Sequence, residues 1–375
     1  MTVLIVTNDF PPRIGGIESF VAAACRFLDG DVVVLTSSSP GGHDWDGAAG
    51  FPVVRLPGPL LPTPAVGRAA AALLRGTGAD RVLFGAAAPL ALLSPSLRAA
   101  GAQRIVALTH GHETWWSTLP GSRALLRRIG DEVDVLTTIS DYVAERISRA
   151  LSPVGRAKLV RLPPPVDLDF FRPAEVHPTS EPPAMRPRRA IGVGRMVRRK
   201  GFDTLLDAWA LRAATPSAAE LVLVGDGPQR RALQRRADRA GLTSVRFTGA
   251  LDPTGVRAEL RASHVFAFPV RTRLAGLDPE GLGLAPLEAA ACGLPVVVGR
   301  SGGAPETLIH GRTGYTVEPG DPYELAARLT DLLTDAALAH RLGAAGRAFV
   351  AERYGADRAR RILRAALGMP DVATV

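Results

Sequence analysis

Short apolar runs alternate with longer segments along most of the chain. The runs are rich in valine, leucine and isoleucine, which is typical of buried strands, and the segments between them are predicted to be helices. The predicted strands are Val3–Thr7, Val32–Thr36, Val53–Leu56, Arg81–Phe84, Ile105–Leu108, Val135–Ile139, Ala190–Gly194, Leu221–Val224, Val245–Thr248, Val265–Phe268 and Val296–Val298. The predicted helices cover residues 19–28, 65–75, 89–99, 122–130, 202–213, 229–240, 253–262, 322–334 and 336–366. This alternation predicts an α/β fold with parallel, doubly wound sheets.

The alternation is interrupted once, which divides the chain into two domains. Pro163, Pro164 and Pro165 break the pattern, and residues 173–187 are rich in proline with little periodicity. Such composition is typical of a linker. We therefore predict an N-terminal domain over residues 1–172, a linker over 173–188, a C-terminal domain over 189–355, and a C-terminal helix and tail over 356–375.

Residues 280–288 join a predicted strand to a predicted helix, and the second domain is organised around them. Pro286 suits the first position of this helix, where its missing N–H is no loss, and Gly293 marks the end. Ligands of doubly wound folds collect outside the carboxyl ends of the strands. The stretch therefore predicts a ligand site.

The residue types in this stretch favour binding of an anionic ligand. Gly281 and Gly283 let a ligand approach the backbone, and the free amides of Leu282, Gly283 and Leu284 lie at the positive end of the helix dipole. Glu280 and Glu288 are eight residues apart, so they stand roughly 80° apart around a helix. We expect Glu280 in the loop and Glu288 in the first turn, contacting different parts of one ligand. An ordinary connection with two solvated glutamates fits the same spacing.

Two loops of the first domain have comparable chemistry. Gly15 and Gly16 follow the first strand, where they fit either a plain turn or close approach of a phosphate or sugar. His110, His112, Glu113 and Trp115 follow the strand Ile105–Leu108. These four side chains suit polyol binding by hydrogen bonds and ring stacking, although a surface loop fits them too. Two histidines are too few ligands for a zinc site.

Composition narrows the class of protein. Hydrophobic residues make up 46% and charged residues 22%, no apolar run is long enough to span a bilayer, and Cys25 and Cys292 are far apart. These features are typical of a soluble protein of a reducing cytoplasm.

The net charge of +9 predicts an anionic partner. Aromatic residues make up only 5%, which argues against nucleic acid, whereas Arg195 and Lys200 after a strand suit a diphosphate.

Several motifs, taken in order, resemble a known family. They are Pro11–Glu18, His110–Glu113, Gly194–Gly201, Gly225–Pro228 and the pair Glu280 and Glu288. Over nearly the whole chain this set resembles the retaining glycosyltransferases of family 4 that have the GT-B fold. Gly276–Gly283 and Ser301–Glu306 look like segments of the actinobacterial phosphatidylinositol mannosyltransferases of the PimB type.

The resemblance implies two Rossmann-like domains facing a deep cleft, with the C-terminal helix packing back towards the N-terminal domain. It implies transfer of mannose from GDP-mannose to a phosphatidylinositol mannoside with α linkage. Another nucleotide sugar, linked to UDP or ADP, and a different acceptor remain open. No cofactor or metal is expected. The expected location is the cytoplasm, peripheral on the inner face of the cell membrane, at an anionic surface.

The resemblance also implies roles for individual residues. The expected catalytic residues are His110, Arg195, Lys200 and Glu280. The expected donor-binding residues are Gly15, Gly16, Arg195, Lys200, Glu280, Gly281, Leu282, Gly283, Leu284 and Glu288. For the acceptor we expect His112, Glu113 and Trp115. Which of the two histidines faces the donor sugar is left open by the motif.

Overall fold

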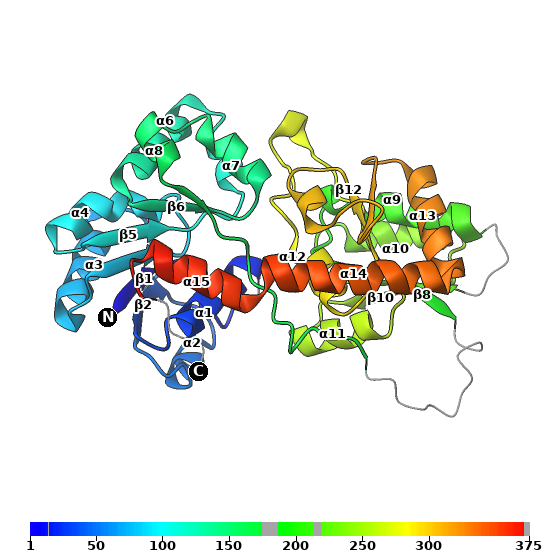
Figure 1. The fold of residues 1–375 in the computed structure, drawn as a ribbon, viewed down its shortest axis with the longest axis horizontal. Helices are drawn as coiled ribbons and strands as arrows, with labels where there is room; N and C mark the ends of the chain where they lie inside the picture. Colours follow the sequence, from blue (N-terminus) through cyan, green and yellow to red (C-terminus); the bar gives the residue numbers. More distant parts are fainter. Residues whose placement is uncertain (14, 175–186, 214–218, 371–375) are drawn as a thin grey trace. The chain divides into compact units, whose positions relative to one another are not determined.

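The computed structural model describes residues 1–13, 15–174, 187–213 and 219–370. The chain forms two compact units (Figure 1). Unit 1 comprises Met1–Pro165 together with Ala356–Val375, and unit 2 comprises Val166–Gly355. Most of the linker predicted over 173–188 lies outside the described residues. Residues 166–172, expected in the N-terminal domain, cluster with unit 2, where Val166 bridges to Gly355.

Unit 1 is built on a parallel seven-stranded sheet of order β3-β2-β1-β4-β5-β6-β7. Its strands are β1 Val3–Val6, β2 Val32–Ser37, β3 Val53–Leu56, β4 Arg81–Phe84, β5 Arg104–Ala107, β6 Val135–Thr138 and β7 Leu159–Arg161. The central strand β1 is wholly buried, which explains its unbroken apolar run. The direction of strand order reverses between β1 and β4, so a topological switch point lies there.

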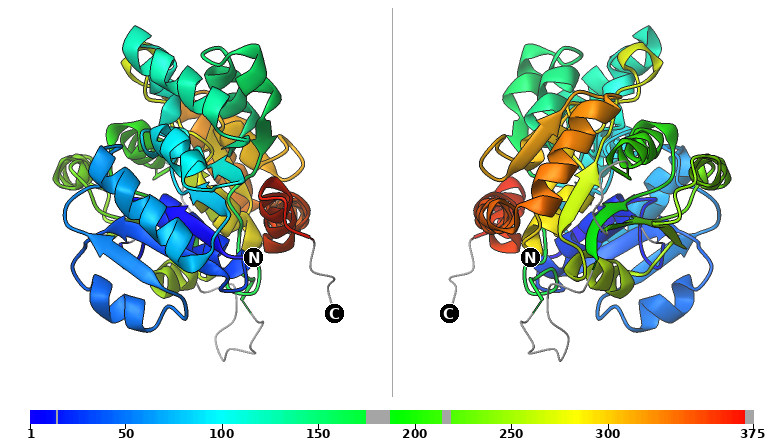
Figure 2. Two further views of the ribbon diagram at one scale, coloured as in Figure 1. Left: turned by 90° about the vertical axis from the view of Figure 1, so that its left-hand side faces the viewer. Right: turned by 90° about the vertical axis from the view of Figure 1, so that its right-hand side faces the viewer.

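Helices cover both faces of the sheets (Figures 1 and 2). Those of unit 1 are α1 Gly16–Phe27, α2 Gly42–Gly47, α3 Pro64–Thr77, η1 Leu90–Leu93, α4 Ser94–Ala99, α5 Glu113–Trp116, α6 Pro120–Glu132, α7 Asp141–Ser148, α8 Pro153–Ala157 and α15 Ala356–Ala366. Several helices begin with a capping residue followed by proline. Thr63, Ser152, Asp252 and Asp321 each accept a bond from a backbone amide in the first turn and precede a proline. The sequence therefore specifies these starts locally.

The C-terminal helix α15 packs within unit 1, as expected. Arg364 is nearly buried, and it donates to the Asp29 carboxylate at 3.1 Å from the end of α1. At the same C-terminal end of α15, Arg81 donates to the Leu367 carbonyl at 2.8 Å and Arg104 to the Ala366 carbonyl at 2.9 Å. Arginines from β4 and β5 thus satisfy carbonyls that the helix end leaves free.

Unit 2 is built on a parallel six-stranded sheet of order β10-β9-β8-β11-β12-β13. Its strands are β8 Arg188–Val193, β9 Ala219–Val224, β10 Val245–Gly249, β11 Val265–Phe268, β12 Val296–Gly299 and β13 Gly314–Val317. Its helices are η3 Arg198–Lys200, α9 Phe202–Ala213, α10 Arg230–Arg239, α11 Pro253–Arg261, η4 Leu274–Gly276, α12 Leu284–Ala291, η5 Ala304–Thr307, α13 Pro322–Thr334 and α14 Ala336–Tyr354. The switch point lies between β8 and β11.

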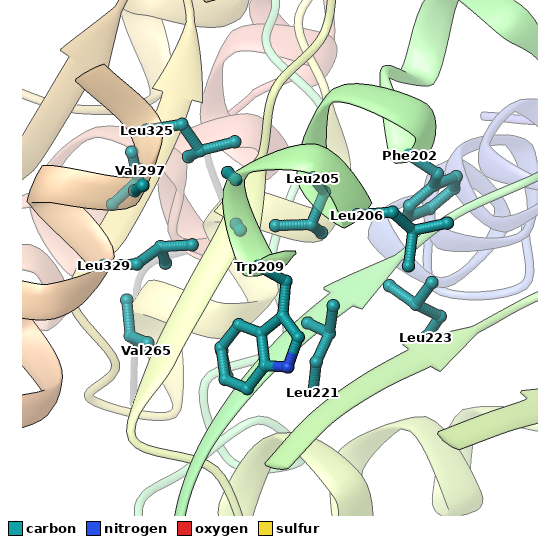
Figure 3. Close-up of a cluster of buried hydrophobic side chains, with 14 of the residues drawn as sticks. Phe202, Leu205, Leu206, Trp209, Leu221, Leu223, Val265, Val297, Leu325 and Leu329 are labelled. Carbon is teal, nitrogen blue, oxygen red and sulfur yellow. The ribbon is translucent and has the colours of Figure 1, made fainter. Parts of the chain in front are cut away.

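One face of this sheet carries α9 and α13 over a continuous apolar core (Figure 3). Trp209 of α9 is 1% exposed and packs beside Leu221 of β9, while Leu325 and Leu329 of α13 are fully buried. The indole N–H of Trp209 donates to the Ser244 hydroxyl at 3.0 Å, so its polar atom is satisfied. This core fixes the strands whose carboxyl ends carry the predicted site.

Several details differ from the sequence-based prediction. The edge strands β7 and β13 were not predicted, because they are short and only partly apolar. The helices predicted over 336–366 are α14 and α15, which Gly355 separates in an extended conformation. Helix α1 begins at Gly16 rather than Ser19, and its N-cap residue, Gly15, has no side chain with which to bond the amides of the first turn.

Candidate functional site

In unit 2, the predicted lysine and glutamate contact each other. Lys200 follows β8 and Glu280 follows β11, the two strands at the switch point. The Lys200 Nζ donates to the Glu280 Oε2 at 2.7 Å, and it lies 4.5 Å from the centre of the Phe268 ring. The side chain of Glu280 is 9% exposed and that of Lys200 is 13% exposed. The pair is therefore a nearly buried, charge-assisted hydrogen bond.

Arg199 extends this pair into a network. Its guanidinium lies 2.9 Å from the Asp278 carboxylate and its Nε 3.7 Å from the Glu280 carboxylate. Two cations thus face two carboxylates at the carboxyl edge of the sheet. The carboxylates hold the side chains of Lys200 and Arg199 in place. A phosphate that binds here would therefore meet hydrogen-bond donors that are already oriented.

Close backbone packing fixes the loops that carry the network. A Cβ at Gly201 would lie 1.9 Å from the Pro269 carbonyl oxygen, and one at Gly302 would lie 2.0 Å from the Glu280 carbonyl oxygen. The Gly303 amide donates to that Glu280 carbonyl at 2.9 Å. Only glycine fits such contacts, and the carbonyl of Glu280 is held by Gly302 and Gly303 together.

Arg195 stands on the loop after β8. The loop is pinned to the loop after β9, since the Met196 amide donates to the Asp226 carbonyl at 2.8 Å, and a Cβ at Gly225 would lie 2.1 Å from the Gly194 carbonyl oxygen. The side chain of Arg195 is exposed and makes no hydrogen bond or ion pair within the described part of the chain. It is available for an anion.

The start of α12 presents the predicted amides. Gly283 is the N-cap residue with φ 101°, a left-handed value that glycine permits. Among the described residues, no acceptor bonds the amides of Leu282, Gly283 and Leu284. The helix begins at Leu284, so Pro286 is its third residue and the prediction of a first position was wrong. The left-handed glycine starts the helix earlier than the proline signal indicated.

Glu288 lies in the second turn of α12, not in the first as predicted. Burial raises the pKa of its carboxyl to about 7. Within the described residues the side chain has no hydrogen-bond partner. A carboxyl that is desolvated and unpaired is a group that a ligand hydroxyl can satisfy.

In unit 1, His110 follows β5 and its ring is held against the loop after β4. The His110 Nε2 lies 2.6 Å from the Gly85 carbonyl oxygen, and the ring meets Phe20 of α1 edge to face, 5.6 Å between centres. Burial lowers the pKa of His110, and the charge of Glu113 only partly offsets this. The imidazole is therefore neutral at pH 7. Because a carbonyl only accepts, Nε2 carries the proton and Nδ1 is left as an acceptor.

Glu113 is buried with no exposed surface. Its Oε2 accepts from the amides of His110 at 3.0 Å and Gly111 at 3.1 Å, and its Oε1 lies 3.2 Å from the His112 Nε2. The assignment of Glu113 to the acceptor stays a prediction, and in this structure the carboxylate is turned into the loop that carries it. His112 is partly exposed and Trp115 is 42% exposed, so both are accessible.

Gly15 and Gly16 lie at the N-terminus of α1, directly after the loop that follows β1. Gly16 is exposed, and its amide and that of Ile17 belong to the first helical turn. A Cβ at Gly15 would meet the Glu18 carboxylate at 2.2 Å. The helix start is accessible to an anion, in competition with this carboxylate.

The sequence did not indicate three residues that contact the predicted site residues and hold them in position. Gly85 accepts from His110, Phe268 lies beneath Lys200, and Asp278 pairs with Arg199. All three lie in, or shortly after, a predicted strand at a switch point, and Asp278 also lies in the segment Gly276–Gly283 that carries the family resemblance.

Family models match both halves of the chain. Residues 14–170 match the model described as Glycosyltransferase Family 4, and residues 175–349 match the one described as Glycosyl transferases group 1. A GDP-mannose-dependent alpha-(1-6)-phosphatidylinositol monomannoside mannosyltransferase of Mycolicibacterium smegmatis is 44% identical, with 94% of each chain covered. A GDP-mannose-dependent monoacylated alpha-(1-6)-phosphatidylinositol monomannoside mannosyltransferase of Corynebacterium glutamicum is 42% identical, with 92% of each chain covered.

Solved structures share the fold. HepE of Anabaena in complex with UDP aligns with a TM-score of 0.81 and 17% identity, covering 98% of this chain and 100% of that one. Sucrose-phosphate synthase of Thermosynechococcus elongatus aligns with a TM-score of 0.78 and 22% identity, covering 96% and 97%. Both support the GT-B fold. Within the described residues, no helix is both long and apolar enough to cross a bilayer.

Proposed function

The chain belongs to glycosyltransferase family 4, and we propose that it moves mannose from GDP-mannose to a phosphatidylinositol mannoside with α linkage. Identity of 44% over 94% of the chain to a mannosyltransferase of that donor and acceptor supports the proposal. The observation that carries it within the molecule is the Lys200–Glu280 bond of 2.7 Å beside the free amides of α12.

The donor's diphosphate is the leaving group of this reaction. Breaking the bond between sugar and phosphate puts negative charge on the phosphate oxygens. Arg195 and Lys200 would neutralise it, and the amides of Leu282, Gly283 and Leu284 would donate to phosphate and sugar. The Glu288 carboxylate would accept bonds from the ribose hydroxyls. Preorganised donors of this kind are often the largest single contribution to catalysis.

Each unit carries one further group that suits a sugar, Glu280 in unit 2 and His110 in unit 1. Glu280 suits sugar hydroxyls because Lys200 bonds only one of its two oxygens, which leaves the other oxygen to accept from a ligand. His110 is neutral with Nδ1 as an acceptor, which suits a hydroxyl donor such as the 6-hydroxyl of mannose. We propose that transfer retains configuration by attack on the same face, assisted by the leaving phosphate and without a side-chain nucleophile.

The acceptor is proposed to meet His112 and Trp115 of unit 1. Trp115 is 42% exposed and lies 5.6 Å from the Trp116 ring, so an aromatic surface stands beside the histidine. Aromatic faces suit the apolar faces of a polyol ring, and the imidazole of His112 suits its hydroxyls.

We further propose that the protein works in the cytoplasm, attached peripherally to the inner face of the membrane. Trp115, Leu119 and Leu125 of the α5–α6 region are 42%, 56% and 39% exposed. Arg127 and Arg128 are exposed on α6. Exposed apolar side chains next to arginines are typical of an anionic lipid surface.

Two experiments test the proposal. Pure protein is incubated with labelled GDP-mannose and the monomannosylated lipid, and a labelled dimannosylated lipid is the expected product. A thermal-shift panel of GDP, UDP, ADP and their mannose and glucose conjugates should show stabilisation by GDP and GDP-mannose only. Stabilisation by UDP or ADP would contradict the donor assignment and leave the glycosyltransferase family unchanged.

A further inference from the structure

The chain makes an excursion between β11 and α12, which we name the 271–278 loop. It is the yellow segment that stands out from unit 2 in Figure 1. The Arg273 amide donates to the Asp278 carbonyl at 3.2 Å, and the Asp278 amide donates back to the Arg273 carbonyl at 3.1 Å. These two bonds close the loop like a hairpin, with η4 at its tip.

The base of the loop is fixed to the rest of unit 2. The Arg271 guanidinium donates to the Asp203 carboxylate at 2.7 Å, and the Arg271 amide to the Arg199 carbonyl at 2.9 Å. Arg199 in turn bonds the Asp278 carboxylate at 2.9 Å. Because both ends are held, the tip projects from a rigid support.

The tip presents two large apolar side chains to water. Leu274 is 62% exposed and Leu277 is 45% exposed. Leu274 also has a φ of 51°, the left-handed region that disfavours a residue with a Cβ. The strained backbone and the exposed leucines both make this loop conformation unfavourable in water. Backbone outliers such as that of Leu274 concentrate at sites that bind a ligand.

Charge next to the tip indicates the kind of partner. Arg273 lies directly before Leu274, and Arg198 is exposed on η3, beside the residue that bonds the loop base. Neither guanidinium has an ion pair within the described ranges. Leucines that enter an apolar layer and arginines that meet phosphates are the pattern of a phospholipid interface with anionic headgroups.

We infer that the 271–278 loop docks unit 2 on the phospholipid surface that holds the acceptor, with Leu274 and Leu277 inserted among the acyl chains. The inference rests on the proposed lipid acceptor. The loop continues through Pro279 into Glu280, the residue proposed to hold the donor sugar. The same rigid segment therefore carries a lipid contact and a donor contact within unit 2.

The test compares lipid and water-soluble acceptors. The double variant L274N/L277N removes both apolar side chains, and asparagine accepts the left-handed backbone of position 274 better than leucine. Kinetics are measured with the monomannosylated lipid in phosphatidylglycerol-containing vesicles and with its deacylated form. The KM for the vesicle-borne lipid is expected to rise about tenfold or more, because the transfer of two leucines into the interface is lost. The values for the deacylated acceptor should stay unchanged.

A matched control is L211N, since Leu211 is 39% exposed on α9 of the same unit. It should alter neither acceptor's KM. An L274N/L277N enzyme that keeps the wild-type KM for vesicle-borne lipid would overturn the inference. So would equal losses on both acceptors, which would place the leucines in the transfer reaction itself or in another contact.

Co-sedimentation with phosphatidylglycerol vesicles free of acceptor separates this inference from the proposed function. If wild type transfers mannose to neither acceptor, the proposed function fails. Docking of the 271–278 loop is then tested by vesicle binding alone. Weaker sedimentation of L274N/L277N than of wild type and L211N supports docking, and equal sedimentation of all three refutes it. Thermal melting of each variant confirms that the fold is intact.

Discussion

Lys200 and Glu280, eighty positions apart in the sequence, form one nearly buried hydrogen bond of 2.7 Å. The family resemblance implies a separate role for each residue, the lysine on phosphate and the glutamate on sugar. Their contact means that each holds the other in position before any donor arrives. The pair therefore links donor chemistry to the stability of unit 2.

Replacing Lys200 by alanine should lower both turnover and stability. It removes the cation expected to stabilise the leaving diphosphate, so kcat/KM should fall by about 10²-fold to 10³-fold. It also leaves the Glu280 carboxylate buried without its partner, which costs about 1–3 kcal/mol of unfolding free energy. Steady-state kinetics and urea unfolding measure the two effects. Glu280→Gln keeps a hydrogen-bond acceptor for the lysine, and should lose activity with a smaller loss of stability.

Nucleotide affinity should depend on pH through Glu288. Its pKa is raised from 4.5 to about 7 in the folded protein, so the carboxyl is largely protonated below that value. The ionised form accepts bonds from ribose hydroxyls best. GDP affinity should therefore rise about fivefold from pH 6 to pH 7, with a proton released on binding. Calorimetry in buffers of different ionisation enthalpy measures both, and Glu288→Gln should flatten the profile.

The same group affects stability without ligand. A carboxyl whose folded pKa lies above its unfolded pKa favours the folded state below the unfolded value, and this contribution disappears as pH rises through the folded pKa. Between pH 4.5 and about 7, Glu288 should therefore cost the protein up to about 3 kcal/mol. Urea unfolding across this range should show a smaller decline for Glu288→Gln than for wild type. Parallel curves would contradict the shifted pKa.

Glu113 is expected to act as a positioning residue for the loop of His110. Its carboxylate accepts from the amides of His110 and Gly111. Glu113→Ala leaves both amides without their partner, and should lower kcat more than it raises the KM for GDP-mannose. Glu113→Gln keeps an accepting oxygen and should recover most of the activity. Glu145→Gln, an exposed glutamate on α7, is the control, and equal losses in both Glu113 variants would instead indicate a role for the charge.

The attachment of α15 to unit 1 should depend on Asp29. This carboxylate accepts from Arg360 at 2.8 Å and from Arg364 at 3.1 Å, and the Arg364 side chain is only 7% exposed. Asp29→Ala leaves that guanidinium without its anion, so unfolding free energy should drop by about 1–3 kcal/mol. Limited proteolysis should cut α15 sooner. Asp31→Ala, whose side chain is 61% exposed, should change neither measurement.

The lack of a metal requirement remains a prediction. If Arg195, Lys200 and backbone amides supply the charge that stabilises the diphosphate, mannose transfer should be the same with excess EDTA as with Mg²⁺. Activity that EDTA removes and Mg²⁺ restores would contradict this account and place a divalent cation beside the phosphates.

The sequence alone was enough to predict the fold class and the loops that carry the site. Runs such as Val296–Val298 specify buried strands, and pairs such as Asp321–Pro322 specify helix starts, through interactions within a few residues. Since parallel strands end at one edge of a sheet, the loops after them were identifiable as ligand sites.

Only the tertiary structure decided how these residues are used. The bond between Lys200 and Glu280 depends on β8 and β11 lying side by side, and local periodicity carries no information on strand order. The burial of Glu113 and the tautomer of His110 depend on which amides and carbonyls the folded loops bring near them. Hydrogen bonds and desolvation act at contact distance, so they become defined only when distant segments meet.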